Sequence, residues 1–202
     1  MQSLITILQQ QAATLSLLEV IAVVMALMYL VLAIRQNIWC WFGAGISTAI
    51  YVYLFFDARL YMQSALNGFY FAMAIYGWVV WRSGQQEEKK LPVISWPLLT
   101  HVYAILFIAA VGFVNGYVLD TQTDSQHAYV DAIIAWGAIW ATFLVARKVL
   151  ENWWYWLVID IASIFIYWSR DLQLTSVLFA VYVIMIPFGL VSWTRSRREA
   201  AS

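Results

Sequence analysis

The sequence is poor in the residues on which soluble domains and their partners depend. Charged residues make up only 11% of the chain, and 11 Lys and Arg are balanced by 11 Asp and Glu. There is no basic stripe that would bind nucleic acid, so no nucleic-acid partner is expected. The single cysteine, Cys40, excludes an internal disulfide and cannot by itself form a zinc site. No segment is long and polar enough to form a soluble catalytic domain.

The sequence motifs of common enzymes are also missing. There is no G-x-x-x-x-G-K-[ST] loop for ATP hydrolysis and no nucleophile elbow. His101 and His127 have no second His and no Cys three or four residues away, which argues against the usual helical metal pair. We therefore expect neither a metal nor a cofactor, and we do not expect an enzyme.

Apolar residues are abundant, at 64% of the chain. They gather in runs about as long as the 17–25 residues that a helix needs to cross a bilayer. These runs predict an all-α integral membrane protein with the lipid bilayer as its surroundings. The seven expected transmembrane helices are Leu17–Ile34, Ile38–Phe56, Gln63–Trp81, Trp96–Val114, Ala128–Ala146, Asn152–Trp168 and Leu174–Trp193.

The distribution of positive charge predicts the orientation. Basic residues concentrate in cytoplasmic loops of membrane proteins. With the N-terminus outside and the C-terminus in the cytoplasm, only Arg59 and Arg170 lie outside. The other nine basic residues are then cytoplasmic: Arg35, Arg82, Lys89, Lys90, Arg147, Lys148, Arg195, Arg197 and Arg198. For a bacterial chain this is the inner membrane.

Residue patterns repeat between the two halves at an offset of 112 positions. Glu19 to Arg35 has the same acid-to-arginine spacing as Asp131 to Arg147. The pattern continues where Tyr70, Gly77 and Trp81 recur as Tyr182, Gly189 and Trp193. Between these matches we infer a slip of two or three residues, which aligns Asn37 with Asn152, Trp41 with Trp156 and Asp57 with Asp171.

Because both repeats end on a cytoplasmic arginine, the halves are parallel, and an additional helix must restore the orientation between them. The sequence therefore predicts two parallel three-helix bundles joined by a linker helix, with a solute path where the bundles meet. The expected segments are an extracytoplasmic N-terminal segment (1–16), the first bundle (17–82), a cytoplasmic loop with the linker helix and an outer loop (83–126), the second bundle (127–194) and a basic cytoplasmic tail (195–202).

The main candidate site is a stripe of Trp153, Trp156 and Asp160. A helix turns about 100° per residue, so positions i, i+3 and i+7 share one face. A carboxylate at mid-bilayer depth costs roughly 2.5–3.5 kcal/mol and therefore faces a protein interior or a cavity. Two indoles and one anion suit a flat, cationic, hydrogen-bonding solute. The alternative is that the tryptophans are interfacial anchors and Asp160 pairs with a polar group on another helix.

Further substrate-binding candidates are expected at mid-depth. Asn67 and Tyr70 share one helix face, and Ser47 and Tyr182 are polar groups inside other spans. Trp41 joins them through its repeat match with Trp156. For each polar group the alternative is a hydrogen bond between helices.

Four other acids are assigned structural roles. Glu19 and Asp131 lie at helix starts, where a negative charge complements the helix dipole. Asp57 and Asp171, beside Arg59 and Arg170, are expected to be solvated turn residues.

These residues resemble the PnuC-type B-vitamin transporters. The W-x-x-W stripe of that family, preceded by Glu-Asn, stands here as Glu151-Asn152-Trp153-Trp154-Tyr155-Trp156 with Asp160. Its third-span pattern appears as Leu60-Tyr61 and then Ile75-Tyr76-Gly77-Trp78 with Trp81, and Asn37 with Phe42-Gly43 looks like the entry to its second span.

The resemblance implies a SWEET-like fold of three, one and three helices. It also implies facilitated diffusion of an unphosphorylated vitamin, which a cytoplasmic vitamin kinase then traps. Trp153 and Trp156 would stack on the solute ring, and Asp160 and Asn67 would hydrogen-bond its polar groups. A homo-oligomer is compatible with the sequence.

Three departures from the family pattern bear on the substrate. Asp160 stands where nicotinamide riboside carriers tend to have Asn, Asn67 where Gln is expected, and Ala74 where Asn is expected. They favour thiamine, as in the thiamine-carrying PnuT branch, over nicotinamide riboside. Two alternatives stay open: a vitamin-capture subunit of an ATP-driven transporter, and a membrane protein that transports nothing.

Overall fold

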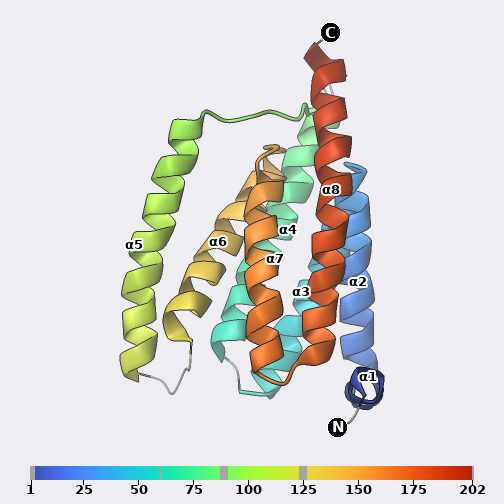
Figure 1. Ribbon diagram of the computed structural model, residues 1–202. Coiled ribbons are helices and arrows are strands. Elements are labelled where there is room, and N and C mark those ends of the chain that lie inside the picture. Colours follow the sequence, from blue (N-terminus) through green and yellow to red (C-terminus); the bar gives the residue numbers. More distant parts are fainter. Residues whose placement is uncertain (1–2, 60, 87–90, 123–126, 202) are drawn as a thin grey trace.

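The computed structural model describes residues 3–59, 61–86, 91–122 and 127–201. Within these residues the regular structure is helical, apart from one isolated β-bridge between Ile94 and Val149 (Figure 1). The helices are α1 (Leu4–Ala13), α2 (Leu17–Ile34), α3 (Cys40–Asp57), α4 (Tyr61–Gln86), α5 (Leu98–Gln122), α6 (Ala128–Ala146), α7 (Asn152–Ser169) and α8 (Gln173–Ala201).

Each predicted span falls on one of these helices, and the differences lie at the ends. α2 and α6 have the predicted bounds. α5 continues to Gln122, so most of the expected outer loop after Val114 is helical. α8 continues through the expected basic segment, from Arg195 to Ala201. α1 was not predicted, because ten residues are too few to register as a membrane span.

Five helices in the described part of the chain are long and apolar enough to cross a membrane: α2, α3, α5, α6 and α8. α7 contains Asn152, Asp160 and several Trp and Tyr residues, which lower its mean hydropathy. α4 contains Gln63 and Asn67 among its apolar residues. The chain is therefore an all-α, multi-pass membrane protein, and membrane crossing by α4 and α7 stays a prediction.

Six helices form a closed ring. α3 packs between α2 and α4, and α7 packs between α6 and α8. These helices form two groups of three, the first group α2–α4 and the second group α6–α8. The groups meet along two seams, where α4 contacts α6 and α8 contacts α2. The third helix of each group thus packs on the first helix of the other, as expected for a pseudo-twofold arrangement.

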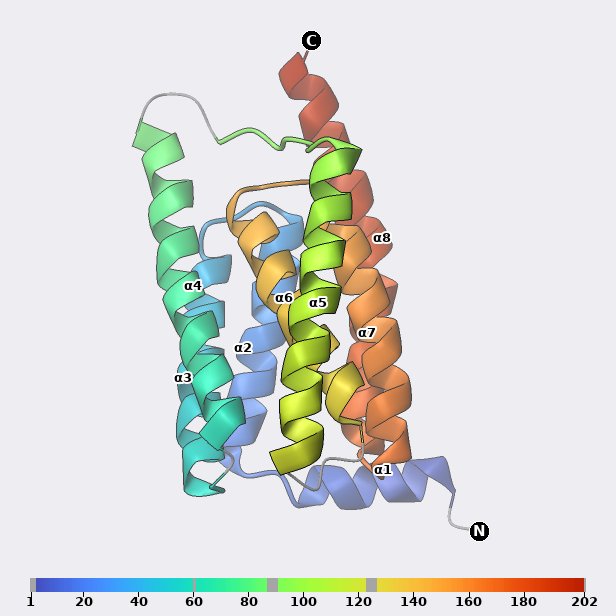
Figure 2. The same ribbon diagram turned by 90° about the vertical axis from the view of Figure 1, so that its left-hand side faces the viewer.

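α5 lies outside the ring and packs on α6 (Figures 1 and 2). The segment that leads into α5 is fixed to the second group: the Ile94 N–H donates to the Lys148 carbonyl (3.0 Å), and the Leu150 N–H donates to the Ile94 carbonyl (2.8 Å). His101 Nδ1 lies 3.1 Å from the Tyr155 hydroxyl of α7. The linker helix α5 and the segment that precedes it are therefore attached to α6–α8.

α1 runs across the end of the helices at which Figure 2 shows the N-terminus. Gln11 fixes it there. Its side-chain amide donates to the Asp171 carbonyl (2.8 Å), and its amide oxygen accepts from the Leu174 N–H (2.8 Å). Since Arg170 lies at the same turn, we name this end of the molecule the Arg170 end. The opposite end, with the α2–α3 and α6–α7 turns, is the Gln36 end.

The internal repeat is confirmed by backbone geometry, and its register is constant. Gln36 and Lys148, 112 residues apart, are both left-handed with φ of 52°. Equivalent hydrogen bonds follow the same offset: Ser64 donates to the Val52 carbonyl and Ser176 to the Ile164 carbonyl, both at 2.9 Å.

The predicted slip between the repeats is therefore wrong. Trp41 corresponds to Trp153 and not to Trp156, because each of them packs on the glycine at the matched position, Gly77 or Gly189. The left-handed turn residue that matches Asp171 is Arg59, not Asp57.

Candidate solute-binding cavity

The ring encloses a cavity of about 480 Å³. This volume lies within the range of roughly 300–1,000 Å³ that is usual for small-molecule sites. All six ring helices contribute to its wall. Among the lining residues are all eight substrate-binding candidates from the sequence: Trp41, Ser47, Asn67, Tyr70, Trp153, Trp156, Asp160 and Tyr182.

Asp160 is the buried acid of the cavity. It lies in α7 with only 4% of its surface exposed. Within the described residues no side chain donates a hydrogen bond to it or forms an ion pair with it, so the alternative of a polar partner on another helix is not what the structure shows. Tyr182 of α8 lies close enough to Asp160 for the two side chains to interact electrostatically. An unpaired carboxylate at this depth needs a cation, a proton or water in the cavity.

The two tryptophans of the stripe have different environments. Trp156 is partly exposed and borders the cavity, so its ring is accessible to a solute. Trp153 is 2% exposed and is held between Gly189 and Trp193, with ring centroids 5.5 Å apart in an edge-to-face contact. Trp153 therefore forms the floor of the cavity at the Gln36 end. The predicted stacking role fits Trp156 better than Trp153.

Trp41 is the counterpart of Trp153 in the first half. It is 2% exposed and makes an edge-to-face contact with Trp81 at 5.5 Å. The indole nitrogens of Trp41 and Trp153 are both buried, and neither has a hydrogen-bond partner among the described residues. Asn152 also lines the cavity, and its buried side-chain oxygen likewise has no partner in the described part of the chain.

The smaller polar candidates differ in how far their hydrogen-bonding groups are already used. Ser47 donates to the Ala22 carbonyl of α2 (2.8 Å), which is the inter-helix role left open as its alternative. Asn67 donates to the Gln63 carbonyl of its own helix (2.9 Å), and its amide oxygen remains available. The hydroxyl groups of Tyr70 and Tyr182 form no hydrogen bond within the described residues.

An ion pair at the Arg170 end of the cavity was not predicted. Arg170 donates to Asp131 across 2.7 Å, and both residues line the cavity with about a third of their side-chain surfaces exposed. Asp131 lies in the first turn of α6, as the dipole argument expected, but it is also bound to the residue that caps α7. No sequence spacing signals a pair that is 39 residues apart.

The formal charge of the cavity follows from these three side chains. Asp131 and Arg170 cancel, and Asp160 remains, so the charged lining residues sum to −1. A solute with one positive charge would neutralise the site.

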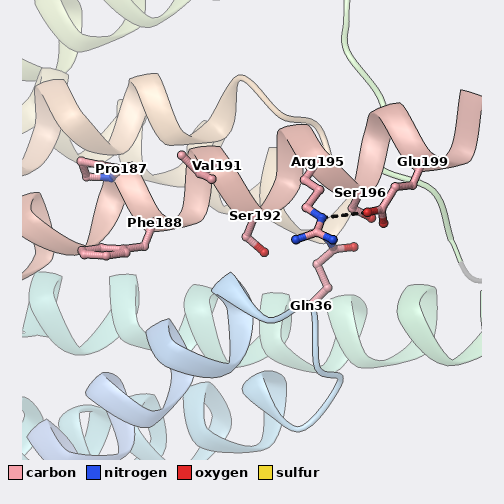
Figure 3. A pocket seen from close by; sticks show the side chains of 8 residues that line it. All are labelled: Gln36, Pro187, Phe188, Val191, Ser192, Arg195, Ser196 and Glu199. Carbon is pink, nitrogen blue, oxygen red and sulfur yellow. Dashed lines mark hydrogen bonds and ion pairs between the residues drawn. The ribbon is translucent and has the colours of Figure 1, made fainter.

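A second groove, of about 700 Å³, lies outside the ring (Figure 3). It runs along α8 from Pro187 and Phe188 to Arg195 and Glu199, with Gln36 of the α2–α3 turn on its other side. None of the eight candidates borders it. Arg195 and Glu199, exposed and four residues apart, form an ion pair along it. We therefore place the candidate site in the ring and not here.

Comparison with known proteins agrees with this arrangement. The nicotinamide riboside transporter PnuC of Escherichia coli K12 is 26% identical over 215 residues, covering 93% of this chain and 89% of that protein. The riboflavin/roseoflavin transporter RibM of Streptomyces davaonensis is 24% identical over 186 residues, covering 90% of this chain and 87% of RibM. A crystal structure of the vitamin B3 transporter PnuC superposes with a TM-score of 0.72 at 20% identity, over 96% of this chain and 90% of that one.

A family model described as nicotinamide mononucleotide transporter matches residues 16–195. That match spans α2 to α8 up to Arg195, and so it contains every residue of the cavity. The chain belongs to the PnuC family of nicotinamide mononucleotide-type membrane transporters and is not an enzyme.

Proposed function

We propose that this chain carries an unphosphorylated, singly cationic B vitamin across the membrane by facilitated diffusion, and that nicotinamide riboside is its solute. The observation that carries the proposal is the carboxylate of Asp160, unpaired among the described residues, in a cavity of formal charge −1. A pyridinium ring that stacks on Trp156 gains cation–π attraction as well as the charge of Asp160. Tyr70, Tyr182 and Asn67 offer hydrogen bonds to a sugar.

The names of the relatives support nicotinamide riboside over thiamine. The structure weakens two of the three arguments that favoured thiamine. Ala74 is 3% exposed and does not line the cavity, so its identity says little about the solute. The Asn67 amide is already bonded to its own helix. Asp160 alone still favours thiamine, whose amino group and fixed charge suit a carboxylate, and thiamine is our second candidate.

We propose the following placement in the membrane. α2 to α8 cross the bacterial inner membrane as a SWEET-like set of three, one and three helices, with the N-terminus outside and the C-terminus in the cytoplasm. α7 has 18 residues, like α2 and α3, and packs between α6 and α8. The Gln36 end then faces the cytoplasm. Of the nine basic residues assigned to that side, Lys89 and Lys90 lie outside the described residues.

Facilitated diffusion alone equalises the solute on both sides of the membrane. Net uptake therefore needs a reaction that removes the solute, and we propose a cytoplasmic vitamin kinase as the functional partner. The phosphorylated product carries negative charge, which the cavity charge of −1 repels.

The test uses purified protein in liposomes, with radiolabelled nicotinamide riboside, thiamine and riboflavin as separate probes. We expect equilibrating uptake of nicotinamide riboside without ATP. Loss of the partner of a buried charge costs about 2–5 kcal/mol, so Asp160→Asn should lower uptake at least ~30-fold. Asp120→Asn, on the exposed face of α5, is the matched control and should leave uptake unchanged.

Each other outcome has a defined meaning. Equilibrating uptake of thiamine, without uptake of nicotinamide riboside, would select the second candidate. If no probe enters and all three bind, the chain is a capture subunit that needs an energising partner. Unchanged uptake in Asp160→Asn would remove the mechanism proposed here.

A further inference from the structure

Four tryptophans form a layer across the Gln36 end of the cavity. Trp41 of α3 meets Trp81 of α4 edge-to-face, and Trp153 of α7 meets Trp193 of α8 in the same way, each pair at 5.5 Å between centroids. Trp81 and Trp193 then meet each other at 6.4 Å, so the layer is continuous from one group to the other. Trp193 is fully buried and Trp81 is 3% exposed. This layer separates the cavity from the Gln36 end.

The layer is bonded across both seams in a reciprocal way. The Trp81 indole N–H of the first group donates to the Ala146 carbonyl in the last turn of α6, at 3.0 Å. The Trp193 indole N–H of the second group donates to the Ala33 carbonyl in the last turn of α2, also at 3.0 Å. Carbonyls in the last turn of a helix have no partner within the helix, so they are available acceptors. Each group thus holds the helix end of the other.

Other bonds between the two groups gather at the same end. Ser192 donates to the Ile34 carbonyl (2.8 Å), and Lys148 donates to the Gln36 side chain (3.3 Å). The Lys148 ammonium also lies 4.6 Å from the centre of the Trp81 ring. At the Arg170 end, no hydrogen bond between described residues joins a ring helix of one group to a ring helix of the other.

We infer that Trp81 and Trp193 are positioning residues that hold Trp41 and Trp153 as the floor of the cavity, and that their two indole hydrogen bonds keep the Gln36 end closed. Opening at that end requires both bonds to break, because they cross the two seams of one ring. The inference deepens the proposed function, on which it rests for the direction of transport. The closure itself can be tested without any solute.

The chain contains its own reporter of this opening. Cys40 is the only cysteine, is fully buried, and belongs to the same apolar cluster as the four tryptophans. Its rate of alkylation by N-ethylmaleimide therefore measures how often the Gln36 end opens. The measurement is made on the full-length protein in liposomes, well below the unfolding temperature, by mass spectrometry of the intact chain.

Trp81→Phe and Trp193→Phe keep an aromatic ring and remove the donor. A net hydrogen-bond contribution of about 0.5–1.5 kcal/mol corresponds to a rate increase of about 2- to 12-fold for each variant. In the double variant the two factors should multiply, because both bonds resist the same movement. With nicotinamide riboside supplied at the Arg170 end, the KM should rise, because the closed form that binds from that side is less populated.

Two controls separate opening from general instability. Trp154→Phe removes a 56%-exposed indole at the same end and should leave the Cys40 rate unchanged. Ser176→Ala removes a partly buried hydrogen bond near the Arg170 end and lowers stability without touching the layer. If Ser176→Ala raises the Cys40 rate as much as the Trp variants do, the reaction reports unfolding and the inference falls.

A surface variant covers the case in which the Trp variants fail to fold. Gln36→Ala removes the Lys148 bond from a partly exposed position and should raise the Cys40 rate by a smaller factor. Unchanged Cys40 rates in the folded variants overturn the inference even if the liposomes transport nicotinamide riboside. Raised Cys40 rates without transport support the inferred closure of the Gln36 end and remove only the proposed function.

Discussion

The contact between Gly189 and Trp153 gives the sharpest quantitative prediction. A Cβ atom at Gly189 would lie 2.4 Å from the Trp153 ring, where ordinary contacts begin at 3.4 Å. The ring cannot retreat freely, because Trp193 packs on it edge-to-face. Gly189→Ala should therefore force a shift of α7 against α8, at the typical overpacking cost of about 1–3 kcal/mol.

The intrinsic helix preference acts in the opposite direction and sets the control. Ala is favoured over Gly in a helix interior by about 1 kcal/mol. At Gly68 of α4 a Cβ atom would meet nothing within 4 Å, so Gly68→Ala gains the preference without a clash. The two substitutions are chemically identical, and only Gly189→Ala adds the clash.

The assay is thermal unfolding in detergent micelles, followed by tryptophan fluorescence. For a chain of this size 1 kcal/mol corresponds to about 2–4 °C in Tm. Gly68→Ala should raise the Tm by about 2–4 °C. Gly189→Ala has the same helix preference and the clash as well, so its Tm should lie about 2–12 °C below that of Gly68→Ala. A Gly189→Ala variant as stable as Gly68→Ala, with normal uptake, would refute the close packing of Trp153 and its role as cavity floor.

Three further perturbations test separate parts of the structure. Arg170→Gln changes the cavity charge from −1 to −2. The ion pair of Arg170 with Asp131 is partly exposed and worth up to about 1 kcal/mol. The KM for nicotinamide riboside and the Vmax, measured by concentration-dependent uptake, should therefore both fall by about 2- to 5-fold. Adding Asp131→Asn restores the charge and should restore both constants, and failure of that rescue contradicts the charge argument. Ser176→Ala should cost about 1 kcal/mol in thermal unfolding and leave uptake unchanged, because its bond to Ile164 lies outside the cavity lining. Gln11→Ala should speed hydrogen exchange in α1 about tenfold while the ring helices stay protected; equal protection of α1 would show that other contacts hold it.

The sequence predicted the helices well where apolar runs are long. α2 and α6 have the predicted bounds because polar or charged residues flank their apolar runs closely. α1 escaped prediction because its Gln-rich sequence has no span-length apolar run, although Ser3 caps it as a helix N-terminus. The end of α5 was misplaced because polar residues at Asn115 and Asp120 suggest a loop, while Gly116 packs closely on α6.

The error in the repeat register has a simple origin. Trp153 and Trp156 are both possible matches for Trp41 in an aromatic-rich sequence, and residue type cannot choose between them. The left-handed turns at Gln36 and Lys148 decide it, and a non-glycine left-handed residue has no reliable sequence signature. The repeat and its offset could be predicted, whereas its register needed backbone geometry.

The cavity residues were predicted for a different reason. A charged group inside an apolar helix is costly, so Asp160 indicates a cavity even without a structure. The pair of Asp131 and Arg170 gave no such signal, because both lie near helix ends where charge costs little. Polar groups deep in a span can therefore be found from sequence, and those at its ends cannot.

The pseudo-twofold relation divides the residues of the ring by role. Positions that the halves share include those that close the Gln36 end: Trp41 with Trp153, Gly77 with Gly189, and Trp81 with Trp193. Positions that differ include those that give the cavity its charge and its accessible indole: Ala44 against Trp156, Thr48 against Asp160, and Ala58 against Arg170.

This division follows from the two tasks. A closure that crosses two equivalent seams is best built from equivalent parts, since both seams must open together. A vitamin with one charged ring and one polar end has no twofold symmetry, so a symmetric cavity would hold it equally well in two opposite orientations. Placing the carboxylate of Asp160 and the ring of Trp156 in the second half removes that ambiguity. Moving the carboxylate to the matched position, in the pair Thr48→Asp with Asp160→Thr, should therefore fail to restore the uptake that Asp160→Thr loses, because the charge would face Ala44 and not Trp156.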